Sequence, residues 1–213
     1  MRLIPVIAVA IGLLIPRPSF GQGWTEYVSQ QDFFTANFPG EPEVSDITFQ
    51  SEYAMTLPGK VYSHENGPTR YSVTVIDYTD IEAKHAERAE QCRAEGGDGD
   101  LCVNRWNTDM RAAIVYVTWP FFQRDGEVTH LSHYQADRVE GQALQLTNAD
   151  GSRTYASINM HEDRLYILEG TVPAGAAPPM LFQQSLGFID EEGRGVRYQS
   201  PYVNGFPPPP RAQ

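Results

Sequence analysis

The sequence predicts an α+β fold, in which an antiparallel β-sheet carries helices on its faces within a single domain. Two observations lead to this prediction. Most of the chain reads as short strands separated by turn residues, and one central stretch changes to helical periodicity. At 213 residues, the chain is long enough for one domain with a substantial core, and we find no internal repeats.

Five stretches rich in aromatic or β-branched residues predict the strands that come first in the chain. They are 24–27, 33–38, 47–53, 60–63 and 70–78. We expect the Leu-Pro-Gly stretch 57–59 to separate the third strand from the fourth, because proline and glycine interrupt strands.

Two helices are predicted in the middle of the chain. Thr79 and Glu82 have the spacing of a capping box, which indicates a helix over 81–93. The glycine-rich stretch 96–100 ends this helix, and a second one is expected after Asn104. Its inward face is expected to carry Trp106, Met110, Ala113, Ile114 and Val117, which recur at helical spacing.

Strand character returns after Gly126. The predicted strands are 128–134, 139–147, 153–160 and 165–172. A short helix is expected over 180–186, and the domain is predicted to span 22–197. Residues 198–213 include four consecutive prolines and are predicted as an extended, disordered tail, with a polyproline ligand for another protein as the alternative.

Residues 1–21 predict a cleavable signal peptide. Arg2 supplies a positive start, 3–15 is apolar, and Ser19 and Gly21 place small residues at the −3 and −1 positions of a cleavage site. The apolar stretch is shorter than the roughly 20 residues that a spanning helix needs. We therefore expect export to the periplasm or out of the cell, without stable membrane insertion after cleavage. An uncleaved anchor is the alternative.

Cys92 and Cys102 are the only cysteines, and an exported chain with one pair most simply forms one disulfide. The bond would tie the end of the first helix to the start of the second. A metal pair or free thiols are the alternatives, but neither is supported by a Cys-x-x-Cys spacing.

The charge of the chain argues against a nucleic-acid partner. The net charge is −11, and removal of 1–21 takes away Arg2 and Arg17 but no acidic residue, which makes it −13. Such a surface repels nucleic acids and anionic membranes.

Sequence motifs for catalysis are missing. The chain has no Gly-x-Ser-x-Gly, Ser-x-x-Lys, P-loop or Gly-x-Gly-x-x-Gly motif. A zinc site would need the fold to gather His130, His133 and His161, and the acidic loop 95–100 lacks the ligand spacing of a calcium loop. We therefore assign no catalytic residue, no metal ligand and no cofactor.

A candidate binding patch follows the second helix. Trp119, Phe121 and Phe122 form an aromatic group around Pro120, directly before a charged stretch. If they are exposed, they offer an apolar surface to a small ligand or a protein partner. The alternative is that they close the core over the helix.

Two short motifs resemble those of a known group. The strand end 37–42, Asn-Phe-Pro-Gly-Glu-Pro, and the segment 181–188, Leu-Phe-Gln-Gln-Ser-Leu-Gly-Phe, are similar to motifs of the PsbP-like α/β/α sandwich group of small exported proteins. The resemblance spans about 24–190. It implies an antiparallel sheet with helices on both faces, and it implies an accessory or binding role without catalysis.

These observations predict an exported, non-enzymatic binding or accessory protein of the bacterial envelope, whose partner is a protein or a small ligand. The alternative is an envelope hydrolase that uses carboxylates or a metal. A purely structural or stress-related role is the third possibility.

Overall fold

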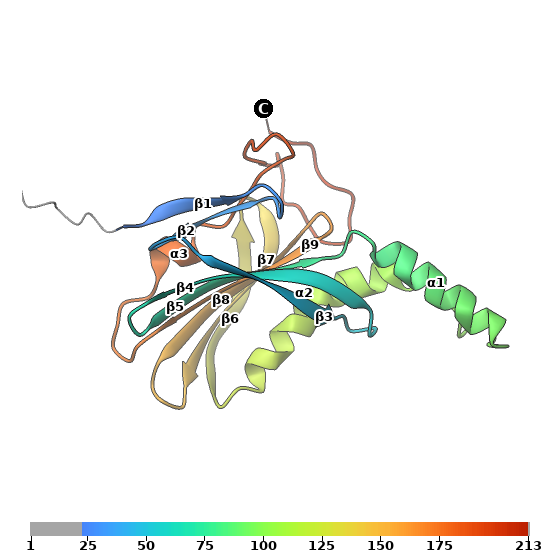
Figure 1. The fold of residues 1–213 in the computed structure, drawn as a ribbon, viewed down its shortest axis with the longest axis horizontal. Helices are drawn as coiled ribbons and strands as arrows, with labels where there is room; N and C mark the ends of the chain where they lie inside the picture. Colours follow the sequence, from blue (N-terminus) through green and yellow to red (C-terminus); the bar gives the residue numbers. More distant parts are fainter. Residues whose placement is uncertain (1–22, 213) are drawn as a thin grey trace, which may run out of the picture.

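The computed structural model describes residues 23–212, so the predicted signal peptide lies outside the described residues. At its centre is a seven-stranded antiparallel sheet with the strand order β3-β4-β5-β9-β8-β7-β6 (Figure 1). Its strands are β3 (Glu43–Gln50), β4 (Thr56–Asn66), β5 (Thr69–Asp77), β6 (Gly126–Ala136), β7 (Val139–Asn148), β8 (Arg153–His161) and β9 (Arg164–Val172).

A smaller sheet covers one face of the central sheet. Its strands are β1 (Thr25–Ser29), β2 (Phe34–Phe38) and β10 (Gly187–Phe188), and the short helix α3 (Met180–Gln183) packs beside it. Aromatic side chains dominate this half of the core. They include Phe34, Phe38, Tyr62, Tyr166, Phe182, Phe188 and Tyr198.

Two helices follow β5 in the chain, and the second of them covers the opposite face of the central sheet. α1 (Ile81–Ala94) follows β5, and α2 (Trp106–Phe122) packs against β6, β7 and β8. The second half of the core lies beneath α2 and is mainly aliphatic. It includes Leu57, Ile76, Val117, Leu144, Ile158, Met160 and Leu165. The expected antiparallel sheet with a few helices is therefore confirmed.

The predicted break at 57–59 is wrong, because β4 runs through it. Pro58 pairs only with Thr48 of β3, since the pairing with β5 begins at Gly59. Gly59 passes so close to its neighbours that an added Cβ would lie 2.8 Å from the Val75 carbonyl oxygen. Pro58 and Gly59 thus lie in the strand at positions where a proline and a glycine are tolerated.

The capping box is also absent. Asp80 is the N-cap of α1 and makes no side-chain capping bond. The Thr79 hydroxyl instead donates to the Asp77 carboxylate over 2.5 Å. Asp77 ends β5 two residues earlier, and a local side-chain bond of this kind competes with helix capping.

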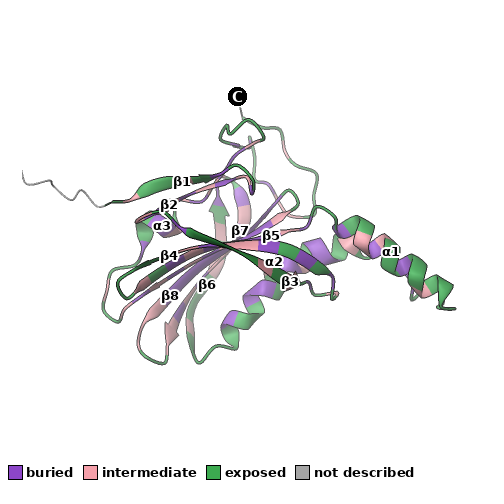
Figure 2. Cartoon of the chain, in the orientation of Figure 1, coloured by how far each residue is buried: buried purple, intermediate pink, exposed green. Residues whose placement is uncertain are grey.

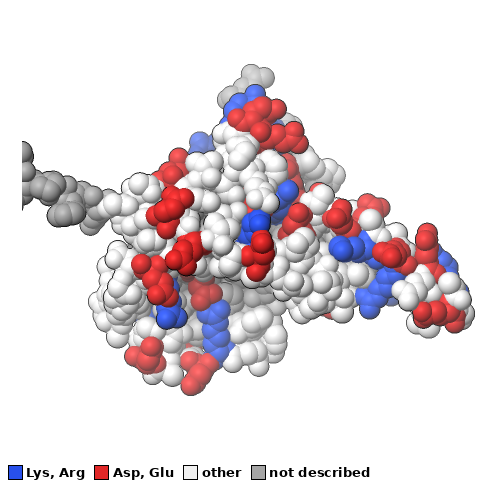
Figure 3. Space-filling model, in the orientation of Figure 1, with Lys and Arg blue, Asp and Glu red and all other residues white. Residues whose placement is uncertain are grey.

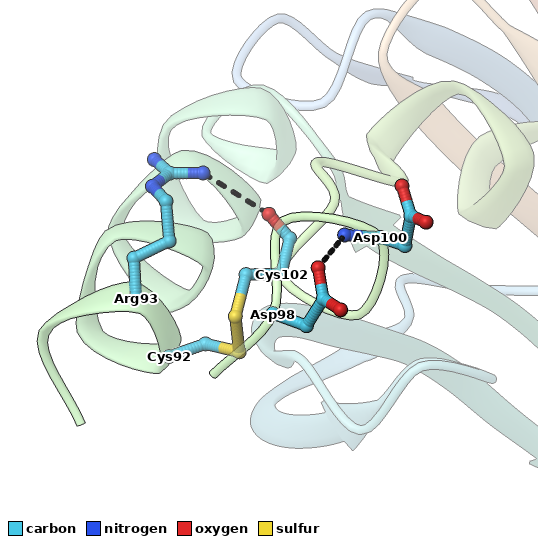
Figure 4. Close-up of a disulfide and its surroundings, with 5 residues drawn as sticks. All are labelled: Cys92, Arg93, Asp98, Asp100 and Cys102. Atoms are coloured by element: carbon cyan, nitrogen blue, oxygen red, sulfur yellow. Dashed lines mark hydrogen bonds between the residues drawn. A yellow bond between two sulfur atoms is a disulfide. The ribbon is translucent and has the colours of Figure 1, made fainter. Parts of the chain in front are cut away.

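The predicted disulfide is present. It joins Cys92, near the end of α1, to Cys102 in the following loop (Figure 4). Arg93 donates to the Cys102 carbonyl oxygen over 3.0 Å, and the backbone N–H of Asp100 donates to the Asp98 carboxylate over 3.1 Å, as the dashed lines show.

Helix α1 stands away from the rest of the molecule as an arm (Figures 1 and 2). Only Ile81, His85 and Ala89 are buried along its length. Within the part of the chain that is described, no helix is both long and apolar enough to cross a membrane.

The C-terminal segment differs from the predicted disordered tail. Tyr198 and Tyr202 are buried in the core beneath the small sheet, and Tyr202 forms a parallel bridge with Val139 of β7. Five of the sixteen residues of 198–213 are prolines, but these two aromatic side chains precede the proline run and anchor the segment.

Candidate functional site

Helix α2 is apolar on two sides. The chain carries no charged residue from Ala112 to Gln123. Met110, Ala113, Val117 and Phe121 face the core, as expected for a helix that packs on a sheet. The opposite side also exposes apolar side chains, with 64% of Val115, 63% of Trp119 and 43% of Phe122 accessible.

The structure divides the predicted aromatic patch. Trp119 and Phe122 lie on the outer side of α2 with their rings stacked, 6.4 Å between centroids. Phe121 points inward and is buried in the core beneath α2. The Arg124 guanidinium covers its ring at 4.1 Å from the centroid. Two of the three predicted side chains are thus available to a ligand.

An open groove runs between α2 and the β3–β5 part of the sheet, which α2 does not cover. Its volume is about 440 Å³. Tyr116, Trp119 and Pro120 form the helix wall, Phe49 of β3 forms the other wall, and Ile167 lies on the floor. The Phe49 and Tyr116 rings meet edge to face at 6.1 Å across the groove. We refer to this feature as the α2–β3 groove.

An ion pair lies where the α2–β3 groove passes the end of the helix. Arg124, just after α2, donates two hydrogen bonds to the Glu169 carboxylate of β9, over 2.6 and 2.9 Å. This bidentate geometry fixes both side chains. Glu169 also lines a second hollow, so the groove continues beyond the end of the helix.

This second hollow is polar, and we call it the acidic trough. Its volume is about 600 Å³. Glu43, Ser63, Ser72 and Glu169 are paired in register across β3, β4, β5 and β9, so their side chains share one face of the sheet. Glu41, Glu65 and Arg70 complete the polar lining, together with His64 and Thr171.

The acidic trough holds more carboxylates than cations. Arg70 pairs with Glu65 over 3.0 Å, and Arg124 pairs with Glu169. Among the described residues, Glu41 and Glu43 make no salt bridge, which leaves two uncompensated negative charges. Acidic groups are also spread widely over the face in Figure 3, with basic groups between them.

A buried polar cluster joins α1 to α2 and the β3–β4 loop, and no sequence motif predicts it. The Asp109 carboxylate accepts hydrogen bonds from the Ser51 hydroxyl over 2.6 Å and from His85 Nε2 over 3.0 Å. All three side chains are buried. In a nucleophilic triad, the histidine stands between serine and carboxylate. Here the carboxylate stands between them, so the cluster is a structural link.

The three histidines considered as zinc ligands each interact with a different partner. His130 hydrogen-bonds to Ser132, and His133 faces Glu140 over 3.6 Å, both at the surface of β6. His161 is buried, and its Nε2 lies 2.7 Å from the Tyr198 hydroxyl. Within residues 23–212, no three His, Cys, Asp or Glu side chains gather in a way that could hold a metal ion.

Burial perturbs His161 strongly. Phe188, Tyr198 and Tyr202 surround its ring, with the Phe188 centroid 4.3 Å away. Desolvation lowers the pKa of this imidazole to about 3, and Arg211 and Arg164 add to the effect. His161 is therefore neutral at physiological pH and acts as a polar member of the core.

Comparison with known proteins leaves the site to be judged on its geometry. No protein-family model and no curated protein sequence matches this chain.

Proposed function

We propose that this chain is an exported, non-enzymatic binding protein of the bacterial envelope, acting in the periplasm or outside the cell. Its site is the α2–β3 groove together with the acidic trough. The ligand class is an amphipathic cation, a molecule that carries a flat apolar group and an amine or guanidinium. The resemblance to the PsbP-like group agrees with an accessory role of this kind.

The apolar half of the proposal rests on the exposed aromatic lining of the groove. Trp119 leaves 63% of its surface accessible to solvent. Burial of apolar surface contributes about 25 cal/mol per Å². A flat group inserted beside Trp119 and Tyr116 would also gain from ring stacking, roughly 0.5–1.5 kcal/mol for a good aromatic pair.

The charge preference rests on the acidic trough. Glu169 belongs to both hollows, so the trough begins where the groove ends. Its unpaired Glu41 and Glu43 favour a positive group over a negative one, and the ring faces of Trp119 and Tyr116 do the same. The two volumes, about 440 and 600 Å³, lie in the usual range of ligand sites, about 300–1,000 Å³.

A matched pair of probes tests the proposal. A diphenylalkylamine and the diphenylalkanoate of the same chain length are titrated into the full chain by calorimetry. We expect the amine to bind about tenfold more tightly than the acid, which corresponds to about 1.4 kcal/mol. Equal binding of the two probes, or no binding of either, would overturn the proposed ligand class.

Two variants with matched controls locate the site. Trp119→Ala should weaken both probes, whereas Val115→Ala, equally exposed on α2 but outside the groove, should leave both unchanged. Glu43→Gln should weaken only the amine, and Glu127→Gln, exposed on β6, should have no effect. If Val115→Ala weakens binding as much as Trp119→Ala, the groove is not the site.

The envelope hydrolase stays the alternative, and no arrangement in the described residues favours it. It predicts turnover of an envelope polymer that is lost in Glu43→Gln. Binding of the amine without release of any product would count against it.

A further inference from the structure

The proline run near the C-terminus is held at both of its ends. Before it, the Asn204 side-chain amide donates to the Met110 carbonyl oxygen over 2.7 Å. The Phe206 ring lies beneath the Arg111 guanidinium, at 5.5 Å from the centroid. After it, the Gln199 N–H donates to the Pro210 carbonyl oxygen over 2.8 Å.

The far end has two further attachments. The Ala212 N–H donates to the Arg197 carbonyl oxygen over 2.6 Å. Arg211 forms a bridge with Tyr198 and an ion pair with Glu162 over 3.2 Å. The residues between these anchors, 207–210, are all prolines, so the segment spans from one fixed point to another.

Four consecutive prolines favour a polyproline II helix, because each ring fixes φ near −65° and disfavours the α conformation of the residue before it. This helix has three residues per turn, so positions three apart share an edge. Phe206 and Pro209 lie on one edge, Pro207 and Pro210 on the second, and Pro208 and Arg211 on the third.

The exposure follows these edges. On the first edge, Pro209 is half-buried and faces the protein, whereas Phe206 contacts Arg111 but stays 58% exposed. Pro207 and Pro210 are exposed, so the second edge faces solvent. On the third edge, Pro208 is exposed but lines a hollow with Met110, and Arg211 is held by Tyr198 and Glu162. Domains that recognise polyproline II helices bind them in an aromatic-lined groove and read a Pro-x-x-Pro spacing, which Pro207 and Pro210 provide on the exposed edge.

We propose that residues 206–211 form a presented polyproline ligand for a partner domain with an aromatic-lined groove that reads Pro207 and Pro210. The attachments at both ends order the segment before binding and so reduce the entropy lost in the complex. This surface is separate in sequence and in lining residues from the α2–β3 groove, so the two proposals stand independently.

The test uses the full chain and a purified SH3 domain of the Pro-x-x-Pro-reading class as the probe. Labelled SH3 domain is titrated with the chain and its NMR shifts are followed. Pro209→Ala and Pro210→Ala each remove one proline and weaken the helix alike, but only Pro210 lies on an outward edge. We expect Pro210→Ala to weaken binding about tenfold and Pro209→Ala less than about threefold.

The free peptide of residues 204–213 provides the second comparison. If the segment is presented as we propose, the full chain binds the SH3 domain at least as tightly as the peptide. Binding by the peptide but not by the chain would show that the segment is masked and would overturn the proposal. Equal losses in the two proline variants, or no binding at all, would do the same.

Discussion

The His85 imidazole donates to the Asp109 carboxylate over 3.0 Å, and this bond joins α1 to α2 inside the protein. The same carboxylate oxygen accepts from Ser51. Asp109 is fully buried, so its carboxyl group depends on these partners for hydrogen bonds.

Replacement of Asp109 by alanine should destabilise the chain. The change leaves the His85 and Ser51 donors buried without their acceptor, and such losses cost about 3–5 kcal/mol. Urea unfolding measures the effect. The control is Glu90→Ala, which removes an exposed carboxylate from α1 and should change stability by less than about 0.5 kcal/mol. Similar values for both variants would mean that the buried cluster contributes little.

Stability should fall with acidification because of His161. Its pKa is about 3 in the folded protein and near 6.5 when unfolded, so between these values the unfolded chain binds more protons. The contribution of His161 is therefore complete above about pH 6.5 and is lost as the pH falls towards 3. The slope in this window is at most about 1.4 kcal/mol per pH unit.

The variant His161→Gln isolates this contribution. It keeps a partner for the Tyr198 hydroxyl but cannot titrate, so the pH dependence of its unfolding free energy should be flatter between pH 6.5 and 3. His130→Gln changes an exposed histidine and should keep the wild-type slope. A wild-type slope in His161→Gln would contradict the assignment.

Two glycines of the disulfide loop should respond differently to alanine. A Cβ at Gly97 would lie 2.5 Å from the Cys102 sulfur and 2.7 Å from the Cys92 sulfur, so the loop must shift. A Cβ at Gly99 meets nothing within 4 Å. We expect Gly97→Ala to cost about 1–3 kcal/mol and Gly99→Ala to be nearly neutral. Thermal unfolding of both oxidised variants checks this difference.

Truncation should separate the two parts of the C-terminal segment. Deletion of 198–213 removes the buried Tyr198 and Tyr202, and loss of one buried aromatic ring already costs about 3–5 kcal/mol. Deletion of 207–213 removes mainly exposed residues and should cost less than about 1 kcal/mol. Circular dichroism during urea unfolding compares the two. Equal stability of both truncated chains would show that the tyrosines do not anchor the core.

Local signals in the sequence predicted most elements correctly. The strand over 70–78 and the helix after Asn104 could be predicted because their apolar side chains recur at a regular spacing. The structure places these elements at Thr69–Asp77 and Trp106–Phe122. The predicted break at 57–59 was wrong because a strand tolerates Pro58 and Gly59 or not according to which neighbouring strand pairs with them. That information lies in β3 and β5, outside the local sequence.

Only part of the candidate site could be predicted from the sequence, for a similar reason. The outward direction of Trp119 and the inward direction of Phe121 follow from where α2 packs on the sheet. The acidic trough depends on the register of four strands, which brings Glu43 and Glu169 to one face although 126 positions separate them in the chain. Asp109 and His85 meet only because α1 and α2 lie in contact, and no spacing in the sequence predicts that contact.

The arm formed by α1 is attached through its first half, and its far end projects from the molecule (Figure 1). Few apolar side chains hold it, so its attachment depends largely on the hydrogen bonds of His85 to Asp109 and of Arg88 to the Tyr53 carbonyl oxygen. The disulfide at Cys92 joins the far end of the arm to the loop that follows it. Apolar packing tolerates small rotations, whereas hydrogen bonds lose strength when their angles change. The hydrogen bonds at the start of the arm therefore set the angle at which it projects. A force on its far end is transmitted to the hydrogen bond between His85 and Asp109.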